Sequence, residues 1–114
     1  MKAIIWYYSD IEIAKNYLDT IMHRYALMRL RGKFKNMRDS AEFRAENGDI
    51  WTIRPCRESF RGVRCNISYV ERGTPEEIVR NLIGPCTTQL PYNGIDYYGP
   101  YEWEKEEKEN NNGK

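Results

Sequence analysis

The sequence predicts a small single α/β domain with a mixed sheet, on the basis of three patterns in its 114 residues. The first is an apolar run at 3–8 followed at once by an amphipathic helix. The second is a hairpin pattern at 42–54, and the third is a strand followed by a helix at 61–83. A helical crossover joins parallel strands, so the first strand is predicted to pair in parallel with the strand inside 61–83. The expected order is β-α-β-β-β-α, in two or three layers with two main helices.

The first helix is predicted to begin after Ser9 and to run to about Leu30, with Gly32 ending it. Ser9 and Glu12 have the spacing of a capping box, in which each side chain satisfies a backbone N–H group of the first turn. Apolar residues recur at steps of three and four, namely Ile11, Ala14, Leu18, Ile21, Tyr25 and Met28. His23, the only histidine, lies off this stripe and is predicted to be on the surface.

The hairpin at 42–54 is predicted from Asn47-Gly48, because this pair readily adopts the positive φ values of a type I′ turn. The residues on both sides of the turn are strand-like, and Pro55 ends the second strand. The segment from Lys33 to Asp39 fits either a short strand or an ordered loop.

The strand and helix at 61–83 carry the clearest local pattern. Apolar residues alternate with polar ones at Val63, Cys65, Ile67 and Tyr69, which predicts one buried face. Thr74 and Glu77 form a second capping box with Pro75 at the first helical position. Gly84-Pro85 is expected to end the helix.

The chain after Pro85 follows no period, and we interpret it as an irregular aromatic-rich segment. The domain is therefore predicted to cover 1–104, with a disordered acidic and Asn-rich tail at 105–114. Aromatic residues of this kind are enriched at protein interfaces, and the predicted interface set is Tyr92, Tyr97, Tyr98, Tyr101 and Trp103. The alternative is that they cap the sheet or a helix of their own domain. If exposed, they mark a partner or homo-oligomer contact.

Composition excludes several classes of protein. No apolar run approaches the ~20 residues that span a bilayer, and the first residues do not resemble a secretory signal, so no membrane partner and a cytoplasmic location are expected. Cys56, Cys65 and Cys86 are an odd number and too widely spaced for a zinc site, so they are predicted to be reduced and buried or half-buried. We expect no metal site, no cofactor and no catalytic residue.

The charge is unevenly distributed along the chain. Residues 1–64 hold 13 Lys/Arg and 8 Asp/Glu, whereas residues 65–114 hold 5 and 9. The predicted nucleic-acid or anionic-partner contacts are Arg24, Arg29, Arg31, Lys33, Lys35, Arg38, Arg61 and Arg64, with Arg44, Arg54 and Arg57 near them. Phe34, Trp51 and Phe60 are placed to stack on bases. The alternative is that the acidic half folds back over this basic surface.

Three segments in the same order resemble the ATPase core of phage terminase large subunits, over roughly residues 2–86. Residues 2–9 and the helix after them resemble the strand and helix that follow the phosphate-binding loop in those motors. Glu46-Asn47-Gly48-Asp49-Ile50-Trp51 resembles their "NGS-x-I" hairpin. Residues 61–72 resemble their "RG-x-R-x-(D/N)-x-x-x-x-D-E" segment, which delivers the Walker B carboxylates.

The chain differs from that family in the residues that the family uses for ATP hydrolysis. The chain contains no G-x-x-x-x-G-K-[ST] segment to hold a triphosphate. The resemblance places Glu71 where the family has the metal-binding Asp, and Arg72 where it has the catalytic Glu. A guanidinium cannot act as a base at neutral pH, so we expect no ATP hydrolysis.

The sequence therefore favours a non-catalytic accessory protein of a phage or prophage that acts by binding. The resemblance implies the cytoplasm of an infected bacterial host, where a protein partner from host or phage machinery is expected. Inhibition of a host nucleic-acid-targeting defence complex fits the opposed charges, because acidic residues such as Glu102 and Glu109 resemble a phosphate backbone. The alternative is a nucleic-acid-binding module that uses residues 24–38 with Arg54 to Arg64.

Overall fold

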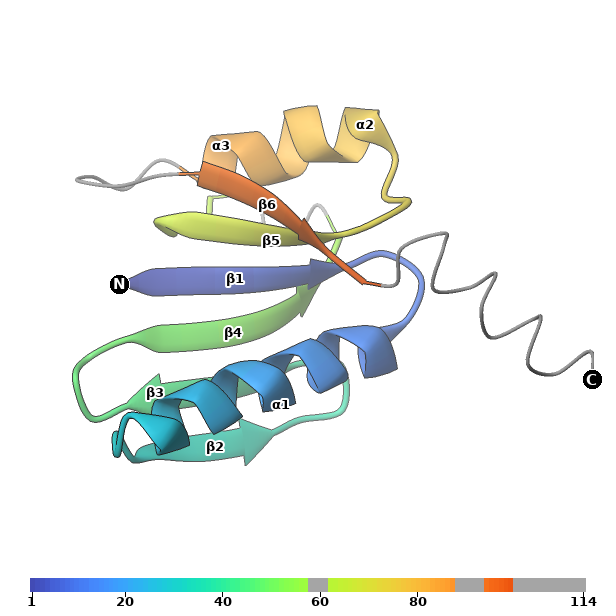
Figure 1. The fold of residues 1–114 in the computed structure, drawn as a ribbon. Helices are drawn as coiled ribbons and strands as arrows, with labels where there is room; N and C mark the ends of the chain where they lie inside the picture. Colours follow the sequence, from blue (N-terminus) through green and yellow to red (C-terminus); the bar gives the residue numbers. More distant parts are fainter. Residues whose placement is uncertain (58–61, 88–93, 100–114) are drawn as a thin grey trace, which may run out of the picture.

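The protein is described from a computed structural model, which defines residues 1–57, 62–87 and 94–99 (Figure 1). These residues form a six-stranded sheet with the strand order β2-β3-β4-β1-β5-β6. The strands are β1 (Lys2–Tyr7), β2 (Gly32–Asn36), β3 (Ala41–Ala45), β4 (Ile50–Pro55), β5 (Ile67–Glu71) and β6 (Gly94–Tyr98). The helical segments are α1 (Ile11–Leu27), α2 (Glu76–Ile78), the π-helical segment η2 (Val79–Ile83) and α3 (Gly84–Cys86).

The sheet is mixed, and its parallel part lies around β1. Strand β1 pairs in parallel with β4 on one side and with β5 on the other, and β5 pairs in parallel with β6. Strands β2, β3 and β4 are antiparallel. The predicted α/β class, the mixed sheet and the parallel pairing of the first strand with the strand in 61–83 are confirmed.

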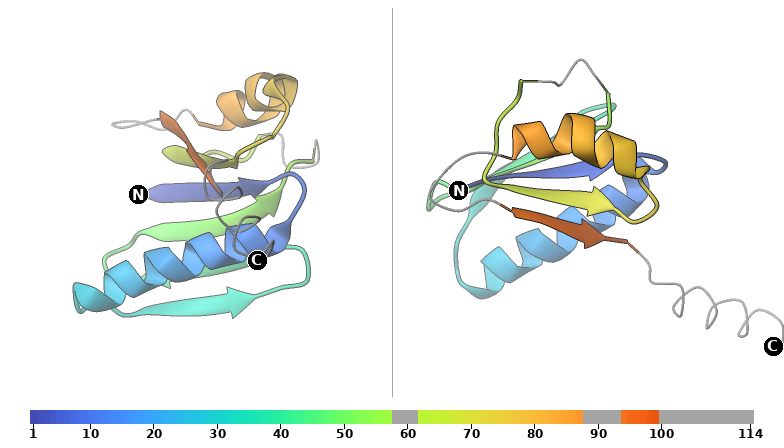
Figure 2. Two further views of the ribbon diagram at one scale, coloured as in Figure 1. Left: turned by 45° about the vertical axis from the view of Figure 1, so that its right-hand side comes forward. Right: turned by 90° about the horizontal axis from the view of Figure 1, so that it is seen from above.

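Helices lie on both faces of the sheet, so the middle of the domain has three layers (Figures 1 and 2). On one face α1 buries Ile5, Leu18 and Ile53 in a single cluster. On the other face, α2, η2 and α3 cover β1 and β5, and Trp6 and Ile83 are fully buried there. Because both faces of β1 are covered, its sequence is a continuous apolar run and does not alternate.

Burial on both faces also changes the interpretation of β5. We predicted one buried face that included Ile67 and Tyr69, but Ser68 and Val70 are the fully buried residues, on the η2 side. Tyr69 is half-buried on the α1 side. The buried Ser68 hydroxyl accepts from Trp6 Nε1 at 3.0 Å, so this polar group does not oppose burial.

The helix ends differ from the predicted ones. The N-cap of α1 is Asp10, whose side chain accepts from the Glu12 N–H, while Ser9 contacts Glu71 instead. The helix ends at Leu27, and Arg29 beyond it adopts a φ of 60°. Residues 28–30 therefore leave the helix before Gly32, in contrast to the prediction.

The second helical segment starts and stops later than predicted. Its N-cap is Pro75 with no side-chain cap, because the Thr74 hydroxyl donates to the Glu71 carbonyl oxygen. Gly84 and Pro85 do not end it: the Gly84 N–H donates to Val79 O, and α3 runs on to Cys86. Pro85 is tolerated because it lies in the first positions of α3.

Three other predicted segments can be compared with the structure: the hairpin, residues 33–39 and the chain after Pro85. The hairpin is confirmed, but its turn is not type I′, because only Gly48 of the pair has positive φ, at 97°. The segment from Lys33 to Asp39 contains the strand β2. The chain after Pro85 was predicted to be irregular, yet it includes β6, which pairs with β5. The tail predicted at 105–114 lies outside the described residues.

The remaining observations concern the cysteines, the histidine and membrane-spanning helices. Cys65 and Cys86 are buried, Cys56 is half-buried, and all are free thiols, as predicted. His23 is exposed, which is also as predicted. None of the helices in the described parts of the chain is long and apolar enough to cross a membrane.

Candidate functional site

The face of β2, β3 and β4 opposite α1 carries a set of basic side chains. Phe34 pairs with Phe43 across β2 and β3, and Phe43 is buried in the cluster under α1. Successive side chains of a strand point to opposite faces. The neighbouring pairs, Lys33 with Arg44 and Lys35 with Glu42, therefore lie on the other face.

The same parity continues across β4 and β1. Arg44 pairs with Ile50, which in turn pairs with Lys2. Thr52 pairs with Glu42, so Arg54, two residues further along β4, also lies on this face. Helices α2, η2 and α3 cover the β1 and β5 end of this face, and among the described residues no helix covers its β2, β3 and β4 end (Figure 2).

A hollow of about 200 Å³ lies on this uncovered surface. Its wall on one side is the segment containing Val63 and Arg64, which follows β4 in the chain. The lining residues are Lys2, Ala3, Ile4, Glu42, Arg44, Ile50, Thr52, Arg54, Val63 and Arg64. Glu42 is the acidic member of the lining, and its carboxylate accepts from Arg44 Nε at 2.9 Å.

We name this surface the open basic face and define it by Lys2, Lys33, Lys35, Arg44, Arg54 and Arg64. Of the predicted contacts, it brings together Lys33, Lys35 and Arg64. Lys2 was missed, since a lone lysine at the start of a buried strand carries no signal in the sequence. Its place on this face follows only from its pairing with Ile50.

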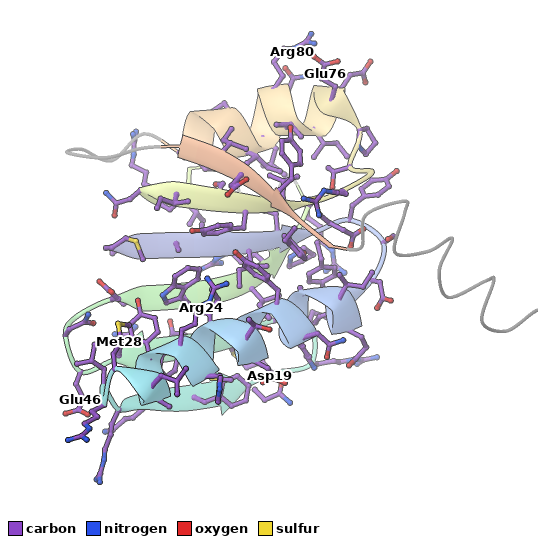
Figure 3. The ribbon with its side chains drawn as sticks, in the orientation of Figure 1. Asp19, Arg24, Met28, Glu46, Glu76 and Arg80 are labelled. Atoms are coloured by element: carbon purple, nitrogen blue, oxygen red, sulfur yellow. The ribbon has the colours of Figure 1, made fainter. Side chains whose placement is uncertain are left out.

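The other predicted basic contacts lie elsewhere. Arg24 is on α1, on the opposite side of the sheet (Figure 3). Arg29 and Arg31 follow the end of α1, where Arg31 lines a hollow beside Lys33 and Arg44, and Arg38 lies between β2 and β3. All four are exposed, and Arg61 lies outside the described residues. The predicted block from Arg24 to Arg38 is thus divided between two sides of the molecule.

The two described aromatic residues that were predicted to stack on bases, Phe34 and Trp51, are not on the open basic face. Trp51 is buried under α1, where its Nε1 donates to the Tyr25 hydroxyl at 3.0 Å, so this prediction is wrong for Trp51. Phe34 is 48% exposed, but it shares the α1 side with Phe43. Phe60 lies outside the described residues.

Two residues of the predicted protein interface, Tyr97 and Tyr98, belong to the described part of the chain, and both lie in β6. Tyr98 is 2% exposed, and its hydroxyl donates to the Trp6 carbonyl oxygen at 2.8 Å. Burial raises the pKa of Tyr98 above its usual value, and the nearby Glu71 adds to the rise. Tyr98 is therefore a core residue, which corrects its assignment to an exposed interface. Tyr97 is 48% exposed, whereas Tyr92, Tyr101 and Trp103 lie outside the described residues.

Glu71 and Arg72, which the terminase resemblance singled out, lie at the carboxyl end of β5. Glu71 is 3% exposed, and its carboxylate accepts from the Ser9 N–H, the Ser9 hydroxyl and the Asp10 N–H. The Arg72 guanidinium donates to the Gly99 carbonyl oxygen.

Burial, with a smaller effect of Glu71, raises the pKa of Cys56 to about 12, so this thiol is protonated near neutral pH.

Clusters of His, Cys, Asp and Glu that could hold a metal ion are absent from residues 1–57, 62–87 and 94–99.

Comparisons with known proteins bear on the fold of the chain. No protein-family model matches the chain, and no curated protein sequence matches it. Among solved structures, the chain is similar to the large terminase from a thermophilic bacteriophage, with a TM-score of 0.51 and 16% sequence identity. The match covers 92% of this chain and 29% of the terminase chain. The predicted resemblance to phage large terminases is confirmed at the level of the fold.

Proposed function

We propose that this protein acts by binding rather than by catalysis, and that the open basic face holds the phosphate backbone of a nucleic acid. The observation that carries the proposal is the strand register, which aligns Lys33, Lys35 and Arg44 on the open basic face. Arg54 and Arg64 extend this set around the 200 Å³ hollow. Cations grouped on one face supply the electrostatic attraction that dominates affinity for nucleic acids.

The arrangement favours contacts with phosphates over contacts with bases. The backbone positions that carry these cations are about 4.8 Å apart on neighbouring strands and about 6.6 Å apart for residues two apart on one strand, so several cations can reach a row of phosphate groups. Exposed aromatic side chains that would stack on bases are absent from this face in the described part of the chain. Contacts to the phosphate backbone of a nucleic acid carry no information about its base sequence, so the expected binding is independent of that sequence.

The absence of catalysis is supported by how the terminase-like positions are used. The N–H groups at the start of a helix are the donors that commonly hold phosphate, and at the start of α1 those of Ser9 and Asp10 bind Glu71. The sequence lacks a phosphate-binding loop motif, and the residue after Glu71 is a cation. The likeness in fold to a phage terminase supports a phage or prophage protein at work in the host cytoplasm.

The binding proposal is tested with labelled single-stranded and double-stranded DNA and with RNA, all of arbitrary sequence, by fluorescence anisotropy at several salt concentrations. The variant Lys33→Gln/Arg44→Gln removes two charges from the open basic face. It is expected to weaken binding by about tenfold or more and to reduce the slope of log K against log salt by about 1.4–1.8.

The matched control, Lys15→Gln/Arg80→Gln, removes two charges from α1 and η2 and should leave affinity close to that of the parent. Failure of the parent protein to bind DNA or RNA at low salt would refute the proposal. Equal losses in the two double variants would show that the open basic face is not the contact.

The proposal that the protein is not an enzyme is tested by measuring ATP hydrolysis with Mg²⁺. We expect turnover at background in the parent protein. Turnover above background that disappears in Glu71→Ala, while Glu76→Ala retains it, would contradict the proposal.

A second candidate function is docking on host machinery, as an inhibitor of a nucleic-acid-targeting defence complex. It is favoured by Ile95 and Tyr97, which are 40% and 48% exposed and lie two residues apart on β6, so they share one face at the edge of the sheet. The assay is phage plating on hosts with and without such a defence system. Expression of the protein should restore plating only on the defended host.

Tyr97→Ala should abolish that restoration, whereas Tyr8→Ala, which truncates a tyrosine of similar exposure (50%), should not. Equal plating with and without the protein on every defended host would argue against this function.

A further inference from the structure

A second hollow, of about 660 Å³, lies where α1 ends and β2 begins. It is on the α1 side of the sheet, opposite the open basic face, because Phe43 belongs to its lining. Its position is marked in Figure 3 by Met28 and Glu46, which lie at this end of the molecule. The lining residues are Met22, Ala26, Arg29, Leu30, Arg31, Gly32 and Phe43.

The floor of the hollow is apolar and its volume suits a small molecule. Met22 and Leu30 are half-buried and Phe43 is 5% exposed, and these three side chains form the apolar floor of a hollow whose rim is polar. Ligand sites of proteins commonly have volumes of about 300–1,000 Å³, and the volume of this hollow falls in that range. A Cβ atom at Gly32 would lie 2.4 Å from the Phe43 ring, so a glycine is required for β2 to approach this floor so closely.

The rim of the hollow is basic, and one of its residues has an unusual backbone. Arg29 and Arg31 are both exposed. Arg29 has a φ of 60°, with its N–H donating to Ala26 O and the Leu30 N–H donating to Tyr25 O, which is the helix ending that glycine usually forms. An arginine is strained in this conformation. A guanidinium therefore stands beside an apolar floor at a position where local structure favours glycine.

We propose that this hollow binds an amphipathic organic anion. The apolar part of the ligand lies on Met22, Leu30 and Phe43, and its carboxylate, sulfonate or phosphate group accepts hydrogen bonds from Arg29 and Arg31. Guanidinium groups make strong charge-assisted hydrogen bonds to such anions, and the apolar floor gains from covering surface that is otherwise in contact with water. The lining of this hollow includes none of the residues that define the open basic face, so the proposal does not depend on nucleic-acid binding.

The test uses 8-anilinonaphthalene-1-sulfonate, an aromatic sulfonate whose fluorescence rises in apolar surroundings, titrated into the full chain. N-phenyl-1-naphthylamine, which has the same aromatic body without the anion, is the matched probe. We expect saturable binding of one sulfonate probe per chain. Arg29→Gly and Arg31→Gln should each weaken it by about tenfold or more, while binding of the neutral probe changes little.

Arg29→Gly also has an expected effect on stability that excludes misfolding as the cause. Because glycine adopts the left-handed conformation without strain, the midpoint of thermal unfolding should rise by about 4 °C while binding of the sulfonate probe weakens. Arg80→Gln removes a charge far from the hollow and should leave probe binding unchanged. Undetectable binding of the sulfonate probe, or equal affinity in the parent, Arg29→Gly and Arg31→Gln, would overturn the proposal.

Discussion

The carboxylate of Glu71, at the carboxyl end of β5, accepts hydrogen bonds from both the backbone N–H and the hydroxyl group of Ser9, at the start of α1. A third bond comes from the Asp10 N–H. The contact ties the ends of β1 and β5 to the first turn of the helix that covers them. A buried negative charge at the positive end of the helix dipole is stabilised there.

Replacement of Glu71 by Ala is therefore expected to destabilise the domain by about 2–4 kcal/mol, because it removes the buried carboxylate that accepts three hydrogen bonds at the start of α1. Chemical denaturation followed by circular dichroism measures the change. Glu76→Ala is the control, since that side chain is 86% exposed and its ion pair with Arg80 lies on the surface. A loss below about 1 kcal/mol in Glu71→Ala would show that this contact does not stabilise the fold.

The two adjacent tyrosines of β6 should respond differently to truncation. Tyr98→Ala removes a buried ring that stacks on Tyr17 and should cost about 3 kcal/mol or more. Tyr98→Phe removes only the hydrogen bond to Trp6 O and should cost about 1 kcal/mol. Tyr97→Ala should stay within about 0.5 kcal/mol of the parent. Similar losses at the two positions would contradict the buried and exposed assignments.

Asp49 makes stability depend on acid pH. Partial burial alone would raise the pKa of its carboxyl, but hydrogen bonds from the Tyr25 hydroxyl, the amino group of Met1 and Asn47 outweigh it and lower the pKa below 3.8. The lowered pKa means that the contribution of Asp49 is fully present above pH 3.8 and is lost as pH falls through the folded value.

Asp49→Asn should therefore be less stable than the parent by about 1 kcal/mol at pH 7, and the difference should shrink as the pH falls below about 3.8. Thermal unfolding between pH 2 and pH 7 measures both variants. A difference that is constant over this range would show that ionisation of Asp49 contributes no stability.

Asp96 is expected to protect the free edge of β6 from pairing with another chain. Gly94 N and Tyr98 O bond to the β5 side, so the backbone groups of Ile95 and Tyr97 point away from β5. The Asp96 carboxylate accepts from the Tyr97 N–H at 2.8 Å and so occupies one of these outward donors. A charged residue on an exposed edge also disfavours strand addition.

Asp96→Ala frees this donor and removes the charge, so self-association at high protein concentration should increase. Sedimentation velocity over a concentration series measures it. Asp19→Ala removes the same charge from the exposed surface of α1 and should sediment like the parent (Figure 3). If Asp96→Ala also sediments like the parent, protection of this edge by Asp96 is ruled out.

The sequence by itself determined the features that depend on neighbouring residues. The apolar run of β1, the stripe of α1 and the Asn47-Gly48 turn predicted a strand, a helix and a hairpin, and together they indicated an α/β domain with a parallel pair. These signals are strong because each arises within a short stretch of chain. The helix ends were predicted less well, since Ser9 and Thr74 have partners other than the predicted caps, in contacts with Glu71.

Only the tertiary structure decided which side chains share a surface. A strand alternates its side chains, so a shift of one residue in pairing moves each of them to the other face, and nothing local reports the register. Register placed Lys33 and Lys35 with Arg44, and it brought Lys2 to the same side. Arg24, on α1, remained on the opposite side. A run of cations that is continuous in the sequence thus became two separate surfaces, because β2 turns back along the sheet after α1.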